Sequence, residues 1–483
     1  MTKILYLLCI LFISAPICFS QPQKTKGKPN IIYIIVDQWR AQATGYSGDK
    51  NAITPNLNRL AAHSMNVKNA VSGMPVCTPH RASLLSGQYP LTTGVFMNDV
   101  MLDTARSTFA KVVGNNGYNT AFIGKWHIDG HGRKSYIPQN RHQGFTYWKA
   151  LECTHDYNKS NYYQGNDTTM LKWDGYDAIA ETEDACRYIK TNANAGKPFF
   201  LMLSLAPPHD PYQSAPQKYR DMYAGKTFVI NENVPASFRD KVQKDLKGYY
   251  SHITALDDCI GSVWKAVKDA GIENNSILVF TADHGDLLGA HGSWNKQQPY
   301  EESIRVPFLI HYPAMLGNTA KTSMVLLNTP DIMPTILGFS KIAIDPKVEG
   351  KDLSNIIMGK AKDNVNETLI SCVQPFGQWS RKMGGKEYRG IVTKQYTYVR
   401  DLNGPWLLFD NSHDPFQLNN LVNNTGYTQL LKNLDARLTH TLLERKDDFR
   451  PGMEYVKQWN YVVDETETIP YITMNFEGKP IIE

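Results

Sequence analysis

Short runs of apolar, mostly β-branched residues alternate with longer amphipathic stretches along the first 350 residues. The runs predict buried strands at residues 31–36, 119–123, 198–205, 276–281 and 306–311. Between them, apolar residues at helical spacing predict helices at residues 56–63, 176–192 and 249–270. This alternation predicts an α/β fold with a large, mostly parallel sheet sandwiched between helices.

The pattern changes near residue 365. A short helical stretch at residues 352–359 is followed by strand-like segments at 388–392, 395–400 and 406–410, and then by an amphipathic helix at 428–445. We therefore predict a large domain at residues 21–365. We also predict a smaller C-terminal α+β subdomain at residues 366–483, with antiparallel strands and a helix. The tail after Arg450 is rich in tyrosine and tryptophan, and we expect it to pack over the large domain.

The first 20 residues have the pattern of a secretory signal. Lys3 precedes a short apolar core at residues 4–13, and Ser20 offers a small residue for cleavage. The core is too short for a good membrane span, and no other long apolar run follows. Lipid attachment at Cys18 is the alternative, but Ile17 before it is large for that purpose. We expect export, to the periplasm or beyond, after cleavage near Ser20.

The net charge of the 483-residue chain is +5, and no run of basic residues is present. This argues against a nucleic-acid surface. Beyond the signal and Cys77, the cysteines are widely spaced and do not form metal-binding pairs. An exported protein is permitted a disulfide, but single buried cysteines are the expectation for Cys153, Cys186, Cys259 and Cys372.

Polar residues stand directly after four of the predicted strands. They are Asp37-Gln38, Lys125-Trp126-His127, Pro208-His209-Asp210 and Asp283-His284-Gly285-Asp286. In an open α/β sheet, ligands bind outside the carboxyl ends of the strands, so these residues are expected to share one site. Loops are polar in general, so polar residues after any one strand need no functional explanation. Polar residues of these types after four strands are better explained by a common site.

A fifth segment is Cys77-Thr78-Pro79-His80-Arg81. Pro79 fits the first turn of a helix, Thr78 or Cys77 is placed to cap it, and Gly87 is placed to end it. Cys77 is thus expected at the positive end of a short helix, where anions bind. The alternative is a small buried cysteine before an ordinary helix.

The pattern C-x-P-x-R resembles the signature of the formylglycine-dependent (type I) sulfatases, which have the alkaline-phosphatase-like fold. Gly124-Lys125-Trp126-His127 resembles a second signature, and Thr281-Ala282-Asp283-His284-Gly285-Asp286 resembles a metal-binding segment. The resemblance runs from about residue 29 to residue 421 with its motifs in the right order. The chain is therefore similar in particular to secreted bacterial polysaccharide sulfatases.

The resemblance implies a role for each of six catalytic residues. Cys77 would be converted to formylglycine by a formylglycine-generating or anaerobic sulfatase-maturating enzyme, and the hydrated aldehyde would be the nucleophile. Arg81 would hydrogen-bond this nucleophile, while Lys125 and Lys296 would stabilise charge on the sulfate. His209 would protonate the leaving oxygen, and His127 would take a proton from the formylglycine diol.

The resemblance also implies a calcium ion. Its ligands would be Asp37, Gln38, Cys77 in its converted form, Asp283 and His284. Oxygen ligands suit calcium. Many family members carry aspartate in place of Gln38 and asparagine in place of His284, so this chain departs from the pattern at two ligands. Histidine is a softer donor than calcium normally takes.

Two insertions are candidates for substrate recognition, at residues 131–173 and 374–388. Aromatic rings pack against sugars, and arginine binds carboxylates or sulfates in pairs of hydrogen bonds. The candidates are His131 and Arg133 in the first insertion, Trp379 and Arg381 in the second, and His291 outside both. Aromatic residues in such loops also serve as buried anchors.

The expected substrate is a sulfated oligosaccharide or polysaccharide, with algal ulvan or carrageenan first and glycosaminoglycan second. Two alternatives stay open. One is a phosphodiesterase or phosphonate monoester hydrolase of the same superfamily, and the other is an inactive glycan-binding homologue.

Overall fold

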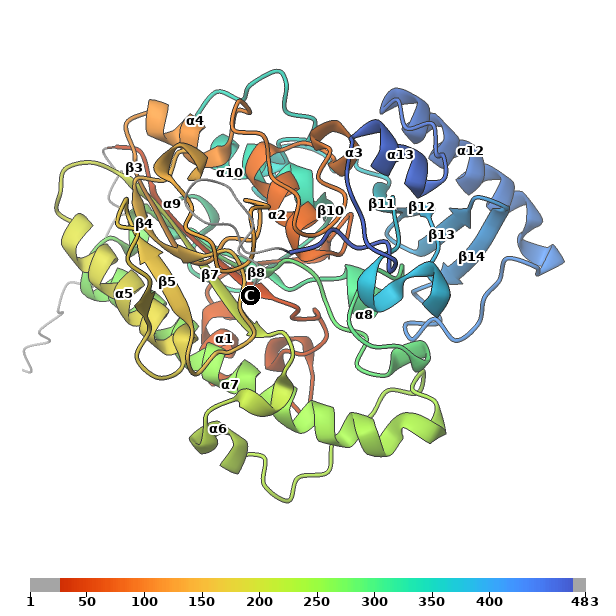
Figure 1. The fold of residues 1–483 in the computed structure, drawn as a ribbon, viewed down its shortest axis with the longest axis horizontal. Helices are drawn as coiled ribbons and strands as arrows, with labels where there is room; N and C mark the ends of the chain where they lie inside the picture. The colour runs from red at the N-terminus through yellow and green to blue at the C-terminus, as the bar shows by residue number, and fades with distance from the viewer. Residues whose placement is uncertain (1–26, 472–483) are drawn as a thin grey trace, which may run out of the picture.

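The structure is a computed structural model that describes residues 27–471. A ten-stranded sheet has the strand order β10-β2-β9-β8-β1-β7-β3-β4-β5-β6, and a second sheet has the order β11-β12-β13-β14 (Figure 1). The large sheet consists of β1 (Asn30–Asp37), β2 (Met65–Val71), β3 (Asn119–Lys125), β4 (Tyr147–Leu151), β5 (Asn161–Gln164), β6 (Leu171–Lys172), β7 (Phe199–Pro208), β8 (Ser276–Ala282), β9 (Phe308–His311) and β10 (Lys321–Asn328).

The central strand β1 is buried along its whole length. It pairs in parallel with β7 on one side and with β8 on the other, so Ile34 lies between Leu203 and Phe280. Each fully buried isoleucine of this kind contributes about 1.5–3 kcal/mol of hydrophobic stabilisation. Because neighbouring parallel strands end at one edge, Asp37 and the residue after Ala282 are brought close together.

The sheet is mostly parallel, as predicted, but it is mixed. Strand β9 runs antiparallel to both β2 and β8, and β5 runs antiparallel to β4 and β6. Strands β2 and β10 were not predicted, because Asn66, Lys68 and Asn69 interrupt the apolar run of β2 and the first residues of β10 are exposed. The predicted loop at residues 131–173 contains β4, β5 and β6.

Helices cover both faces of the large sheet. The helices of the whole structure, including those of the second sheet, are α1 (Pro55–Ala61), α2 (Cys77–Ser86), α3 (Pro90–Thr93), α4 (Phe109–Asn115), α5 (Asp177–Asn192), α6 (Gln217–Asp221), α7 (Arg239–Asp269), α8 (Glu301–Ile304), α9 (Pro313–Leu316), α10 (Thr329–Phe339), α11 (Ser354–Ile357), α12 (Thr428–Glu444) and α13 (Gly452–Gln458). Figure 1 shows α1, α5 and α7 below the sheet and α2, α4 and α10 above it.

Helix α7 packs against α5, α1 and α6. It begins ten residues before the predicted start. The prediction missed these first turns because they carry many charges and bury only Val242 and Leu246 before Gly248. The helix predicted at residues 352–359 is shorter than expected, because only α11 (Ser354–Ile357) is helical there.

The second sheet consists of β11 (Thr368–Cys372), β12 (Tyr388–Val392), β13 (Tyr396–Asp401) and β14 (Gly404–Asp410), all antiparallel. Helix α12 covers it with a small core of its own, formed by Leu369, Ile391, Tyr398, Leu408, Leu434, Leu438 and Leu442. The two sheets are tied together at Gly73, whose carbonyl accepts from the Ser371 amide at 2.8 Å. A Cβ at Gly73 would lie 2.3 Å from Asn328 Oδ1, so only glycine fits this close approach.

The tail packs over the large domain, which confirms the expectation. The Tyr461 hydroxyl donates to the Gly94 carbonyl at 2.8 Å, and its ring lies 5.6 Å from that of Phe96. Within residues 27–471 the cysteines are free thiols. Cys153, Cys259 and Cys372 are buried, as expected, whereas Cys186 is only partly buried. None of the helices in this range has the length and apolar character needed to span a membrane. The predicted signal at residues 1–20 lies outside the described residues.

Candidate active site

The ends of β1 and β8 and the start of α2 bring four ligand-type side chains together. The ligand atoms of Asp37, Cys77, Asp283 and His284 all lie within 4.8 Å of one another, and all four residues are buried. Two carboxylates, an imidazole and a fourth donor make a set that fits a divalent metal ion. The sequence predicted each of these residues, and the structure places them in one cluster.

Cys77 is the first residue of α2, at the positive end of the helix as predicted. The capping prediction was wrong, because the residue at the N-cap is Val76, in extended conformation and with no side-chain hydrogen bond. Cys77 and Thr78 already lie inside the helix, and the Thr78 amide is bound by the Asn98 side chain at 3.1 Å. Gly87 ends the helix in the left-handed conformation (φ 65°), as predicted.

The lone pair of His284 Nε2 points towards this cluster. Its Nδ1 lies 2.9 Å from the Gly285 carbonyl, so Nδ1 carries the proton, and its Nε2 lies 3.2 Å from Cys77 Sγ. Burial lowers the pKa of His284, which keeps the ring neutral. Burial, helped by the charge of Asp37, raises the pKa of the Cys77 thiol to about 12.

The Gln38 side chain has other partners in this structure. Its Oε1 accepts from Lys296 Nζ at 2.9 Å, and its Nε2 donates to Asp286 Oδ2 at 2.8 Å. The Gln38 amide, however, donates to Asp283 Oδ1 at 3.0 Å and so orients a member of the cluster.

Two cations bind the carboxylates of the cluster directly. Lys125 Nζ lies 2.6 Å from Asp37 Oδ2, and Arg81 Nη2 bridges Asp37 and Asp283 at 3.2 and 3.0 Å. The other terminal nitrogen of Arg81 donates to Ser204 Oγ at 2.6 Å. Burial alone would raise the pKa of Asp37, but Lys125 and the neighbouring cations hold it well below its usual value. Arg81 therefore braces the ends of β1 and β8.

Lys296 and His209 form a second pair at the site. Lys296 Nζ lies 2.7 Å from His209 Nε2, while His209 Nδ1 lies 2.8 Å from the Asp210 carbonyl. Nδ1 therefore carries the imidazole proton, and Nε2 accepts from the lysine. Burial and the lysine charge keep the pKa of His209 well below its usual value. Arg81, Lys125 and Lys296 outnumber the carboxylates Asp37 and Asp283, so the site favours an anion.

His127 is oriented by a residue that sequence reasoning missed. Asp99 Oδ1 lies 3.4 Å from His127 Nε2, and both Asp99 oxygens accept from Arg133, at 3.0 and 2.9 Å. Burial opposes its charge, but the close contact with His127 and the hydrogen bonds from Arg133 keep the pKa of Asp99 well below its usual value. Asp99 stands in a loop, remote from any strand end, so the search of strand ends could not find it. His155, whose ring stacks on His209 at 4.9 Å, was missed for the same reason.

The five substrate candidates lie in different environments. Arg133 reaches the site through Asp99, and its guanidinium packs on the Tyr471 ring at 3.9 Å. His131 instead pairs with Asp129, and His291 stacks on Tyr300. Trp379 is buried against Tyr388, and Arg381 forms ion pairs with Glu387 and Glu467. Of the five, Arg133 has the strongest structural case.

Comparisons with known proteins agree on one family. The model of the sulfatase family matches residues 29–342, and that of the C-terminal region of N-sulphoglucosamine sulphohydrolase matches residues 289–444. An ulvan-active sulfatase of Formosa agariphila is 45% identical over 94% of this chain and 89% of its own. An endo-4-O-sulfatase of Bacteroides thetaiotaomicron is 29% identical over 81% of this chain and 88% of its own.

Solved structures have the same fold. A Bacteroides thetaiotaomicron structure connected by name with the metabolism of multiple glycosaminoglycans has a TM-score of 0.79 and 26% identity, covering 92% of this chain and 100% of that one. The alignment therefore extends over both sheets of the present structure, which confirms the predicted fold class.

Proposed function

The chain belongs to the sulfatase family and is a sulfuric ester hydrolase that acts on carbohydrates, and we propose that its substrates are oligosaccharides of a sulfated algal polysaccharide. Ulvan is the first candidate, carrageenan the second, and a glycosaminoglycan the third. The observation that carries the proposal is the group of cations near Cys77 (Arg81, Lys125 and Lys296) in a chain 45% identical to an ulvan-active sulfatase. The presequence at residues 1–20 supports a place outside the cytoplasm, where such a polymer is found.

Two groups complete the site in this proposal. Cys77 would be converted to formylglycine by a maturation enzyme, and Asp37, Asp283 and His284, together with the residue at position 77 and Gln38, would hold a calcium ion. The hydrated aldehyde would supply the nucleophilic oxygen, and the ion would supply positive charge to the site. The buried donor set supports a divalent ion.

The positive side chains of the site bind and orient the sulfate group. Lys125 contacts Asp37, Lys296 contacts His209, and Arg81 fixes the carboxylates of Asp37 and Asp283. In a buried site such charges interact with an anion much more strongly than in water, and they need no rearrangement as charge develops in the transition state. Bound sulfate would also lift the pKa of His209, since a nearby anion favours the protonated ring.

Proton transfer to the leaving oxygen falls to the pair His209 and Lys296. Because His209 Nε2 accepts from Lys296 Nζ, the proton of this pair resides on the lysine in the unliganded site. We propose that, with the anionic sulfate bound, Nε2 takes up a proton from solvent and gives it to the leaving sugar oxygen, while Lys296 keeps its proton and its charge. On the other side, Asp99 holds His127 so that its ring takes a proton from the nucleophilic centre.

The substrate assignment is tested with the matured enzyme and a panel of defined oligosaccharides from ulvan, carrageenan and chondroitin sulfate. We expect sulfate release, measured by ion chromatography, to be fastest with the ulvan fragments, because sugar-binding loops determine specificity around a common sulfate pocket. Aryl phosphate and a phosphonate monoester serve as controls. Faster hydrolysis of either phosphorus substrate than of every sulfate ester would overturn the proposal, as would release from chondroitin sulfate alone.

The substitution Asp99→Asn tests whether Asp99 holds His127 in position for proton transfer. In Asp99→Asn we expect kcat to fall about 100-fold, the scale of a misplaced proton-transfer group. The loss of the negative charge also lowers the pKa of His127, so the acidic limb of the kcat profile should move to lower pH. Asp103→Asn, an exposed change in the same loop, is the matched control. An unshifted pH profile with unchanged kcat would exclude a positioning role for Asp99.

A further inference from the structure

A second polar cavity of about 730 Å³ lies apart from the residues around Cys77. Its lining comes from the loop after β1, from β2, and from the segment around α8, with Lys394, Asn411 and Ser412 of the C-terminal subdomain at one side. None of the proposed catalytic or metal-binding residues lines it. We propose that this cavity is a second binding site for an acidic sugar, with Arg40 as its anion-binding group.

Arg40 is buried and has unused hydrogen-bonding capacity. Only 7% of the residue is exposed, it forms no ion pair with a described carboxylate, and its Nε has no hydrogen-bond partner. Its backbone amide is fixed by the Tyr249 hydroxyl at 3.0 Å, which holds the residue in place. A buried guanidinium donor without an acceptor is costly, so an anion that entered this cavity would regain the missing interaction.

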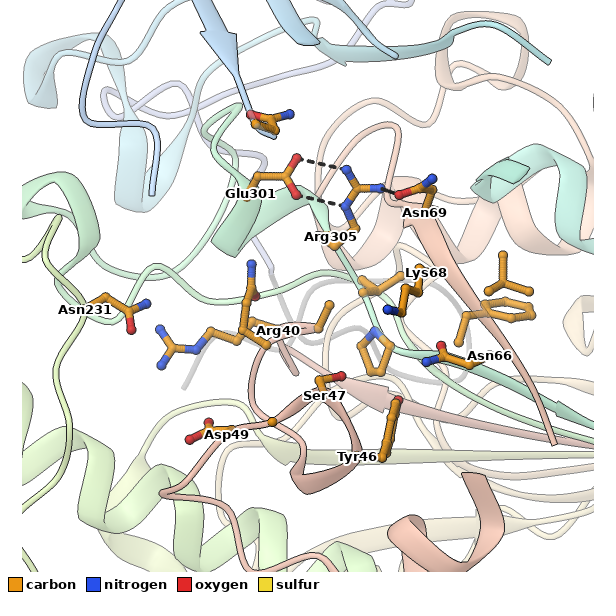
Figure 2. A pocket seen from close by; sticks show the side chains of 18 of the residues that line it. Arg40, Tyr46, Ser47, Asp49, Asn66, Lys68, Asn69, Asn231, Glu301 and Arg305 are labelled. Atoms are coloured by element: carbon orange, nitrogen blue, oxygen red, sulfur yellow. Dashed lines mark hydrogen bonds and ion pairs between the residues drawn. The ribbon is translucent and has the colours of Figure 1, made fainter. Parts of the chain in front are cut away.

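Figure 2 shows the Arg40 side chain extending between Asn231 and Asp49, with Ser47 and Tyr46 along the lower side of the cavity and Lys68 and Asn66 across from it. These groups come from sequence positions far apart, and they face a common space. The volume falls in the range of typical small-molecule sites, about 300–1,000 Å³. A mono- or disaccharide fits such a space.

The charges of the cavity favour an anion. Of its two acidic residues, Glu301 is bound by Arg305 through two hydrogen bonds of 2.9 and 3.0 Å. The other, Asp49, accepts from the Tyr250 hydroxyl and from the Asn51 amide at 2.8 Å. Asp49 keeps its charge and lies near enough to Arg40 to favour the charged guanidinium. Three cations of the lining, Arg40, Lys50 and Lys68, nevertheless form no ion pair among the described residues, so positive charge exceeds negative charge in the cavity. An arginine of this kind binds a carboxylate or a sulfate through two parallel hydrogen bonds.

The remaining groups of the cavity match the hydroxyls of a sugar. Gln42 lines the cavity, and its buried Oε1 has no hydrogen-bond partner. Asn66 and Tyr46 add further polar groups and a ring face to the lining. The anionic character of the ligand follows from Arg40 and the lysines alone, whereas the choice of a sugar over another anion rests on the proposed function.

The site is tested by titrating the full, matured protein with single small ligands in a calorimeter. The probes are glucuronate, glucose 6-sulfate, glucose and sodium sulfate. We expect both acidic sugars to bind at least about tenfold more tightly than glucose, since each gains a charged hydrogen bond. Glucuronate and glucose 6-sulfate distinguish a carboxylate from a sulfate ester as the preferred group. Sodium sulfate that binds as tightly as glucose 6-sulfate would refute the sugar part of the proposal.

Variants then place the ligand in this cavity. Lys68→Met and Gln42→Leu change the cavity wall without removing the buried Arg40, so they keep the test valid if Arg40→Met fails to fold. We expect each to weaken glucuronate binding about tenfold while hydrolysis of an aryl sulfate stays unchanged. Lys432→Met, an exposed change on α12, is the control.

Two outcomes would overturn the second site: acidic sugars that bind no better than glucose, or unchanged affinity in both Lys68→Met and Gln42→Leu. The proposed function is judged separately by sulfate release. A protein that binds glucuronate in this cavity but releases no sulfate from oligosaccharides would contradict the substrate proposal and leave the second site standing.

Discussion

Cys77→Ala will reduce kcat/KM on sulfate esters by about 10⁴-fold or more, the scale seen when a catalytic nucleophile is removed. Its thiol is already poorly suited to attack, because burial beside Asp37 raises its pKa to about 12 and the thiolate is the reactive form. We therefore expect full activity to require a chemical change at position 77. Initial rates with an aryl sulfate, and mass spectrometry of the peptide that contains position 77, measure both parts of this expectation.

Cys259→Ala is the matched control, since Cys259 is a second buried cysteine but lies in α7. It should keep the activity of the wild type at a small cost in stability. In active wild-type protein, the peptide mass should show an aldehyde in place of the thiol. An active preparation in which position 77 is entirely cysteine would contradict the assignment, as would a fully active Cys77→Ala.

The site could be predicted from the sequence wherever its residues follow buried strands. Asp37, Lys125, His209 and Asp283 each stand at or close after the end of an apolar run, and parallel pairing brings such ends to one edge of the sheet. The strands themselves were recognisable because they are apolar on both faces. The local sequence therefore carried the essential information for this part of the site.

Other parts depend on contacts that no local pattern records. Asp99 is linked to His127 and Arg133 only through the folded chain, and Gln38 is turned towards Lys296 and Asp286 by its neighbours. Strand β2 was missed because polar residues in it face the cavity around Arg40. The direction of β9 likewise depends on its partners on both sides, and not on its own residues.

Removal of the metal ion is expected to abolish activity. Asp37, Asp283 and His284 converge with Cys77 at one buried point, and an ion held among them would add positive charge to the site. Exhaustive chelation should lower the rate on an aryl sulfate by about 10³-fold or more, since a preorganised charge contributes several kcal/mol to transition-state stabilisation. Chelation should also lower the Tm, because an ion bound only by the folded state stabilises it.

The identity of the ion is decided by add-back to the chelated protein, with elemental analysis of the purified enzyme. Calcium should restore both the rate and the Tm, and magnesium should restore less, because it demands a stricter octahedral geometry. Asp283→Asn should lose the ion and the rate together, whereas Asp240→Asn, an exposed change on α7, should lose neither.

Zinc is the informative competitor for this site, because the imidazole nitrogen of His284 suits zinc better than it suits calcium. Recovery with zinc but not with calcium would replace the calcium proposal, and full activity of metal-free protein would reject the ligand set itself.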